Sequence, residues 1–69
     1  MRIKVGDKFR DYMGVSYVVK KYEKSIITFE VDGGKESDDI YQRKEFLSNL
    51  NGNIFHIDKS ETLYTEEQV

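Results

Sequence analysis

The sequence predicts a mainly β domain, built as a small barrel or a strongly bent five-stranded antiparallel sheet with one short helix before the last strand. Three observations support this fold class. The chain of 69 residues suffices for one domain only. Several short segments rich in β-branched and aromatic residues alternate between apolar and polar positions. One later segment changes to helical spacing. A two-layer α+β sheet is the alternative way to cover one apolar face.

The strands are expected near residues 2–10, 15–22, 25–31, 38–42 and 53–58. Alternation puts three apolar residues on one face of each of two strands, namely Val15, Tyr17 and Val19, and Ile27, Phe29 and Val31. Between the third and fourth strands, Asp32-Gly33-Gly34 predicts a tight hairpin turn, because glycine readily adopts the positive φ that such turns require.

A short helix is expected over residues 43–50, where Phe46, Leu47 and Leu50 follow an i, i+1, i+4 pattern. Asn51-Gly52 predicts a left-handed helix end, with glycine at or next to the position after the cap. We expect the apolar side of this helix to close the open end of the sheet. A homodimer that shares this surface would also bury it, since the core is small.

Residues 1–58 are expected to form the single domain, and residues 59–69 an acidic tail that either adds an edge strand or frays. The chain has no Cys and a single His56, which excludes disulfides, thiolate metal sites and multi-histidine metal sites. We expect no cofactor. Without a long apolar run or a secretory signal pattern, the simplest expectation is a soluble cytoplasmic protein.

The run Ile3-Lys4-Val5-Gly6-Asp7-Lys8-Phe9, followed by residues 15–20 and 26–31, resembles small SH3-like barrel proteins of low-GC Gram-positive bacteria and their phages. Many of these barrels open on a Val-Gly-Asp turn and close with a short helical turn before the last strand. The resemblance covers about residues 3–57. It implies a protein-binding module, and for the phage members a modulator or inhibitor of a host protein.

Charge is sorted along the chain. Residues 1–24 carry seven Lys or Arg against three acids, and residues 25–69 carry four against ten, so a net charge of −2 hides balances of +4 and −6. The ordinary interpretation of such acids is a solvated loop. The functional interpretation is a negative surface that binds a basic protein, with the candidate residues Glu30, Asp32, Glu36, Asp38, Asp39, Asp58 and Glu61.

Spaced carboxylates can imitate nucleic-acid phosphates, which supply much of the affinity of DNA-binding proteins. The sequence therefore raises the hypothesis of a DNA-mimic-like surface that docks on a basic, DNA-binding host protein. Glu66 and Glu67 would extend that surface if the tail folds back beside the 30–39 segment.

The alternative hypothesis is a small β-barrel that binds nucleic acid. Cations and aromatic rings interleave in the N-terminal third, as in barrels that stack single-stranded bases. The candidate residues are Arg10, Tyr12, Lys20, Lys21 and Lys24, and Tyr12 is the aromatic residue most expected to be exposed. The sequence pI of about 5.3 opposes this hypothesis, because nucleic-acid-binding domains are usually basic.

Catalysis is not expected. His56 lies between Phe55 and Ile57, where alternation predicts a surface or partly buried structural histidine, and no Ser lies in a nucleophile elbow. Gly33-Gly34 is not followed by a phosphate-loop motif, and the acids from Glu30 onward do not have the spacing of an EF-hand. We therefore expect a protein that binds partners and is not an enzyme.

Overall fold

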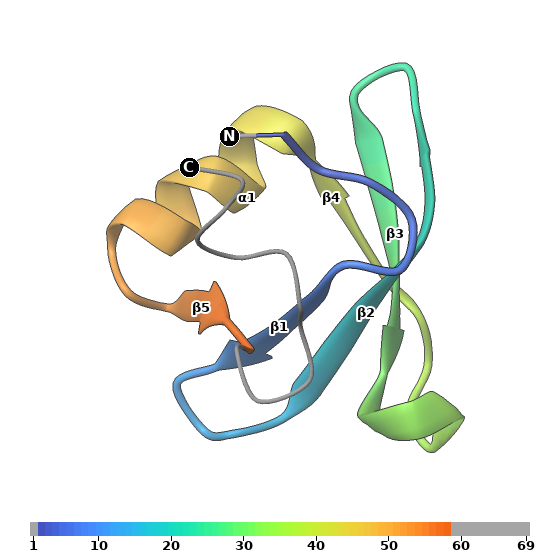
Figure 1. The fold of residues 1–69 in the computed structure, drawn as a ribbon, viewed down its shortest axis with the longest axis vertical. Coiled ribbons are helices and arrows are strands. Elements are labelled where there is room, and N and C mark those ends of the chain that lie inside the picture. The colour runs from blue at the N-terminus through green and yellow to red at the C-terminus, as the bar shows by residue number, and fades with distance from the viewer. Residues whose placement is uncertain (1, 59–69) are drawn as a thin grey trace.

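Residues 2–58, the part of the chain that the computed structural model describes, form one antiparallel sheet and one α-helix (Figure 1). The elements in chain order are β1 (Lys8–Asp11), β2 (Ser16–Glu23), β3 (Ile26–Val31), the 3₁₀ turn η1 (Asp32–Gly34), β4 (Asp39–Gln42), α1 (Arg43–Asn51) and β5 (Phe55–Ile57). The five strands lie in the order β4-β3-β2-β1-β5.

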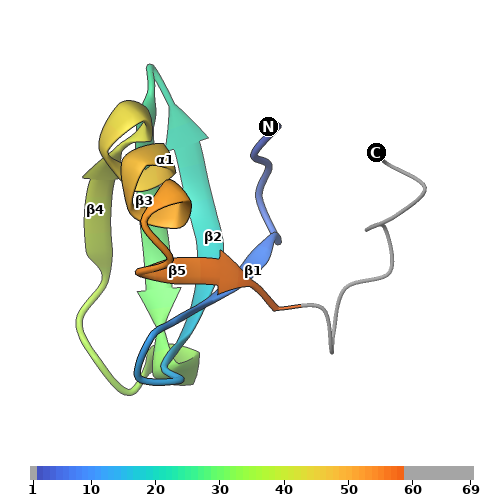
Figure 2. The same cartoon turned by 90° about the vertical axis from the view of Figure 1, so that its left-hand side faces the viewer.

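The sheet curls into a half-barrel, so that its two edges approach each other. Tyr41 on β4 and Phe55 on β5 belong to opposite edge strands, yet their ring centroids are 5.6 Å apart. Figure 2 shows α1 lying against the concave side of this curl. The expected fold class, a strongly bent antiparallel sheet with one helix before the last strand, is confirmed.

Aromatic rings fill the concave side. The buried apolar residues are Ile3, Phe9, Tyr17, Val19, Ile27, Phe29, Val31, Phe46 and Phe55. Phe46 is the one fully buried residue of α1, and its ring centroid lies 4.9 Å from those of both Phe9 and Phe29. Both predicted apolar faces, on β2 and on β3, point into this core, and α1 covers it as expected.

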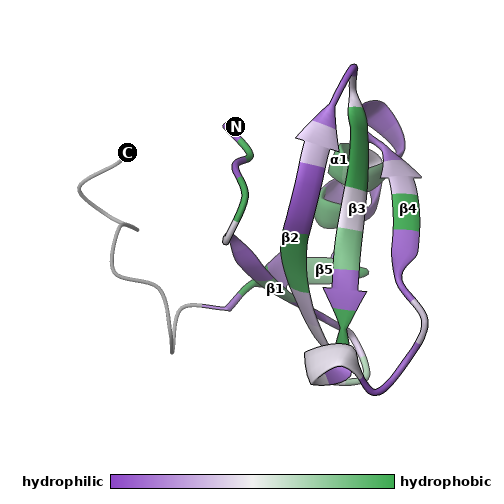
Figure 3. Ribbon diagram, turned by 90° about the vertical axis from the view of Figure 1, so that its right-hand side faces the viewer, coloured by the Kyte–Doolittle hydropathy of each residue, from purple (hydrophilic) through white to green (hydrophobic). Residues whose placement is uncertain are grey.

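The opposite, convex face of the sheet is mixed in character. Figure 3 views β2, β3 and β4 from this side, with α1 behind them. Ile40 on β4 is 67% exposed, and Ile26 at the start of β3 is also exposed. His56 on β5 is exposed as well, which confirms the first of the two positions predicted for it.

The predicted first strand, residues 2–10, is wrong in its first half, because β1 begins only at Lys8. Residues 4–7 form a turn in which the Asp7 amide donates to the Lys4 carbonyl at 3.1 Å. Gly6 adopts φ +96° in this turn, a conformation that a side chain would strain. The buried Asp7 carboxylate stabilises the turn by accepting the Lys4 amide at 3.0 Å.

The left-handed residue after α1 is Asn53 and not Gly52, which corrects the predicted helix end. Gly52 has φ −87°, whereas Asn53 has φ +65°. The Ile54 amide then donates to the Asn49 carbonyl at 2.9 Å, so the last turn of the helix is completed by residues that were predicted to be strand. The fifth strand is correspondingly shorter than 53–58.

Asp32-Gly33-Gly34 does not form a tight two-residue hairpin. These residues make the 3₁₀ turn η1, which begins a longer connection from Val31 to Asp39. Gly33 and Gly34 adopt the positive φ expected of them, and so does Asp32. The tight hairpin lies instead between β2 and β3, where Lys24 and Ser25 both have positive φ as in a type I′ turn.

The expected acidic tail, residues 59–69, and its alternative as an edge strand lie outside the described residues.

Candidate protein-binding surface

Five of the seven predicted acids come together on the β3–β4 connection. We call this group the acidic loop, and it consists of Glu30, Asp32, Glu36, Asp38 and Asp39. Asp32, Glu36 and Asp38 are exposed, whereas the two residues within strands, Glu30 and Asp39, are half-buried. The antiparallel pairing of β3 with β4 sets Asp39 opposite Phe29, so the two ends of the loop are held side by side.

The backbone of the acidic loop folds back on itself. The Lys35 amide donates to the Asp32 carbonyl at 3.2 Å, and the Glu36 amide donates to the Val31 carbonyl at 3.4 Å. Gly34 has φ +91°, and a Cβ atom there would lie 3.0 Å from Oε2 of Glu30. Glycine therefore permits the Glu30 carboxylate to lie against the turn.

Two cations partly neutralise the acidic loop, namely Lys35 within the segment itself and Lys20 from β2. Lys20 is the extra residue of a β-bulge in β2, where the pairing with β3 shifts between Val19 and Lys21. Its ammonium donates to the Asp38 carboxylate at 2.7 Å, and this hydrogen bond raises the pKa of Lys20. Both side chains are largely exposed, so the pair contributes little to stability.

Asp58 does not belong to the exposed acidic surface. Its side chain is only 6% exposed, and it accepts a hydrogen bond from Nε of Arg10 at 2.9 Å. Local alternation could not predict this burial, because Arg10 is far from Asp58 in the sequence. Since Asp58 is buried against Arg10, we exclude Asp58 from the candidate surface. The other predicted member from the C-terminal part, Glu61, lies outside the described residues.

The cations of the alternative, nucleic-acid-binding hypothesis are not gathered in one place. Lys24 lies in the β2–β3 turn, at the opposite end of the strands from Tyr12. Lys20 is paired with Asp38, and Lys21 lies 3.8 Å from the Glu23 carboxylate. Only Arg10 adjoins Tyr12, so the five residues do not make one basic, aromatic surface.

A second exposed feature lies in the β1–β2 connection, which we call the Tyr12 loop (residues 11–15). Tyr12 is 70% exposed, as expected, and Met13 beside it is 72% exposed. Sequence reasoning missed Met13. The signal that could have found it is Asp11 followed three residues later by Gly14, a spacing typical of a turn that carries its two central side chains outward.

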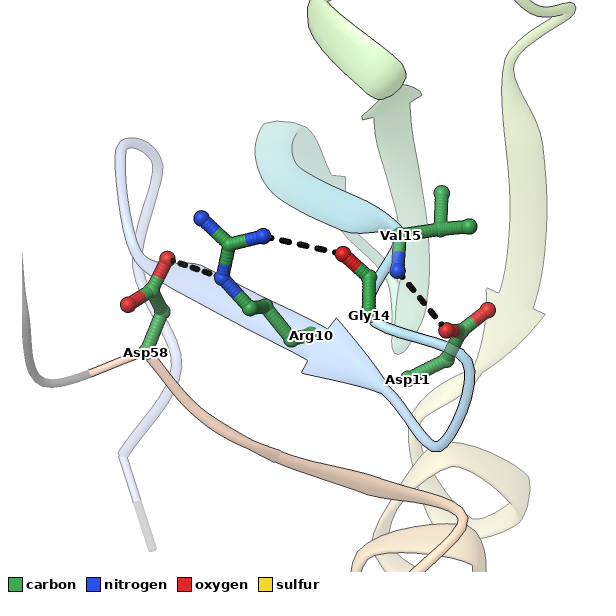
Figure 4. Close-up of polar contacts among 5 residues, drawn as sticks. All are labelled: Arg10, Asp11, Gly14, Val15 and Asp58. Atoms are coloured by element: carbon green, nitrogen blue, oxygen red, sulfur yellow. Dashed lines mark hydrogen bonds and ion pairs between the residues drawn. The ribbon is translucent and has the colours of Figure 1, made fainter.

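The Asp11 carboxylate organises the Tyr12 loop. Its Oδ1 accepts the Met13 amide at 2.8 Å and the Val15 amide at 2.9 Å, while the Gly14 amide donates to the Asp11 carbonyl at 2.9 Å. From the other side, Nη1 of Arg10 donates to the Gly14 carbonyl at 2.9 Å. Figure 4 shows the Arg10 guanidinium between this carbonyl and Asp58.

Tyr17 connects the Tyr12 loop with the acidic loop. Its hydroxyl donates to Oδ2 of Asp11 at 3.3 Å. Burial, followed by the nearby carboxylates of Asp11 and Asp39, raises the pKa of Tyr17 to about 12. Burial and the same two carboxylates, together with Glu45, also raise the pKa of Tyr41. Tyr17 also pairs with Val31, the residue before η1, so the two loops lie at one end of the half-barrel (Figure 1).

The opposite end of the half-barrel is rich in cations. There the Arg43 amide donates to the Ser25 carbonyl at 2.8 Å, which joins the start of α1 to the β2–β3 turn. Lys24, Arg43 and Lys44 lie at this end, and Figure 1 shows it opposite η1 along the longest axis of the molecule. Glu23 and Glu45 lie at this end as well, so it is mixed in charge and the charge sorting in the sequence is not reproduced as two oppositely charged ends.

The geometry gives no indication of a metal centre. Among residues 2–58, no group of three or more His, Asp or Glu side chains is arranged to hold a metal ion. No helix in the same part of the chain is long and apolar enough to cross a membrane.

Comparisons with protein-family models, curated proteins and solved structures gave no match. The surface itself is therefore the basis for a functional proposal.

Proposed function

We propose that this protein is a non-enzymatic binding module that docks its acidic loop on a basic surface of another protein. The observation that carries the proposal is the gathering of five carboxylates at one end of the half-barrel. The other end is mixed in charge, because Glu23 and Glu45 lie there beside Lys24, Arg43 and Lys44. A local excess of negative charge orients an approaching basic partner and speeds encounter more than it strengthens the final complex.

A DNA-binding host protein is the partner class that fits best. Its basic surface normally receives phosphates, and exposed carboxylates can occupy the same positions. Asp32 and Glu36 are the exposed members of the acidic loop best placed for this purpose, because the third exposed member, Asp38, already accepts a hydrogen bond from Lys20. In this proposal the protein is an inhibitor or modulator of the kind found among small phage proteins, and it competes with nucleic acid for its partner.

The test is capture of partners from a lysate treated with nuclease, with the wild type and two charge variants as bait. D32N/E36Q removes two exposed charges from the acidic loop. E23Q/E45Q removes the same number of charges from exposed residues near the other end and serves as the matched control. We expect one or more basic proteins to be captured by the wild type and the control, and to be lost with D32N/E36Q or at high salt.

Capture that is equal for all three baits, or that resists high salt, would contradict the proposal. Loss of every captured protein on nuclease treatment would contradict it as well, since the bait would then be binding nucleic acid.

A further inference from the structure

The Tyr12 loop combines a rigid backbone with an apolar tip that the core does not use. Tyr12 and Met13 are 70% and 72% exposed, and neither belongs to the buried cluster nor to the residues packed against it. Exposed aromatic residues and methionine side by side are typical of the centres of protein interfaces. Isolated exposed apolar residues are common on any surface, so the backbone around this pair decides its significance.

Five hydrogen bonds hold the loop in one conformation. The Asp11 carboxylate accepts hydrogen bonds from the Met13 and Val15 amides, and the Asp11 amide donates to the Val15 carbonyl at 3.1 Å. The Gly14 amide donates to the Asp11 carbonyl, and Arg10 donates to the Gly14 carbonyl (Figure 4). Gly14 itself has φ +87°, a conformation that favours glycine. A loop fixed in this way loses little conformational entropy on binding, so contacts made by its tip contribute more to affinity.

The surroundings of the tip favour a protein partner over nucleic acid. Asp11 lies at the base of the loop, and the acidic loop lies at the same end of the half-barrel (Figure 1). Arg10, the cation that adjoins the tip among residues 2–58, directs Nε to Asp58 and Nη1 to the Gly14 carbonyl. A nucleic-acid backbone would meet carboxylates here, whereas a basic protein would meet complementary charge.

The base of the Tyr12 loop adjoins the start of β5. Asp11 is the register partner of Phe55, and Ile54, the residue before Phe55, is 41% exposed. A third exposed apolar residue therefore lies on the segment next to the base of the loop.

We propose that Tyr12 and Met13 form the apolar anchor of the partner interface and insert into an apolar pocket within the basic surface that the acidic loop contacts. This inference rests on the proposed function and adds to it a second chemical requirement on the partner. The partner must offer an apolar pocket flanked by Lys or Arg, and a uniformly charged surface would not suffice.

Two labelled synthetic peptides of equal length and charge would test the anchor by fluorescence anisotropy. Both carry flanking Lys and Arg residues; one has a central Leu-Phe pair and the other a central Ser-Ser pair. We expect the wild type to bind the Leu-Phe peptide about tenfold more tightly, the range of a modest interface hot spot. Y12S/M13S should remove this preference, and a two-dimensional NMR spectrum would verify that the variant is folded.

The matched control is I40S, which removes an apolar side chain of nearly equal exposure, 67%, from the convex face of β4. It should keep the full preference. D32N/E36Q should weaken the binding of both peptides by a similar factor, because it changes charge and leaves the tip intact.

The outcomes separate the anchor from the proposed function. Equal binding of the two peptides, weakened by D32N/E36Q, would overturn the anchor and support the acidic docking surface. A Leu-Phe preference that Y12S/M13S removes, with no effect of D32N/E36Q, would support the anchor and overturn acidic docking. Binding of neither peptide would overturn both. Tight binding of an oligonucleotide that Y12S/M13S abolishes would assign the tip to nucleic acid and overturn the anchor.

A further pair of variants tests whether loop rigidity matters. D11N keeps an oxygen that can accept the Met13 and Val15 amides, whereas D11A removes both hydrogen bonds, and each variant loses the same charge. We expect D11A to lose more of the Leu-Phe preference than D11N, although both retain Tyr12 and Met13. Equal preferences in D11A and D11N would show that rigidity does not contribute to the anchor.

Discussion

Phe46 is the residue on which the closure of the half-barrel depends most, and its replacement by alanine gives the sharpest test of the fold. The side chain is 0% exposed. Its ring centroid lies 4.9 Å from Phe9 and Phe29, 5.0 Å from Phe55 and 6.0 Å from Tyr41. It therefore joins α1 to β1, β3, β4 and β5 at once.

Removing a buried Phe side chain usually costs about 3–5 kcal/mol, the sum of the lost transfer free energy of the ring and the cost of the cavity left behind. At about 0.05–0.15 kcal/mol per residue, a chain of 69 residues has a free energy of unfolding of about 3–10 kcal/mol. We therefore expect F46A to remove at least about a third of the free energy of unfolding, and all of it if the wild type lies at the lower end of that range. F46L retains most of the volume and loses the ring contacts, so it should cost about 1–2 kcal/mol.

Urea unfolding followed by circular dichroism and tyrosine fluorescence would measure these free energies. S48A, on the exposed side of the same helix, is the control and should change stability by less than about 0.5 kcal/mol. A cooperative F46A transition with an unchanged m-value and a loss below about 2 kcal/mol would refute the reasoning, because α1 would then not be closing the core.

Three further predictions concern stability. K24N/S25G should raise the free energy of unfolding by about 1 kcal/mol, because Asn-Gly suits a turn with positive φ at both positions; a lower urea midpoint would contradict this. Burial and two nearby carboxylates raise the pKa of Tyr17 from 10.0 to about 12, so the stability that this phenol contributes is complete below pH 10 and is lost between pH 10 and pH 12. Over that interval the free energy of unfolding, measured with urea, should fall by about 2 kcal/mol more for the wild type than for Y17F. Parallel pH profiles of the two proteins would argue against the raised pKa of Tyr17. D58N should cost about 1.5–3 kcal/mol, because a buried charge-assisted hydrogen bond from Arg10 is weakened; an unchanged urea midpoint would mean that this pair does not stabilise the fold.

The functional surface was only partly predictable from the sequence. The acids from Glu30 to Asp39 are close in the chain, so their convergence on one loop follows from their spacing. Asp58 was predicted to join them, but it is buried against Arg10. The partner of Asp38 is likewise distant in the chain, because a bulge in β2 sets Lys20 within 2.7 Å of it. Pairings of this kind depend on the register of neighbouring strands, which no local pattern encodes.

By itself, the sequence determined the fold class, the faces of β2 and β3, the position of α1 and the uneven distribution of charge. These properties follow from alternation, helical spacing and composition, all of which act over a few residues. Only the tertiary structure decided how far the sheet curls, which brings the edge strands β4 and β5 together through Tyr41 and Phe55. It also decided that the Tyr12 loop and the acidic loop lie at the same end. Both outcomes arise from packing a few large rings into one small core, and that packing depends on contacts between segments far apart in the chain.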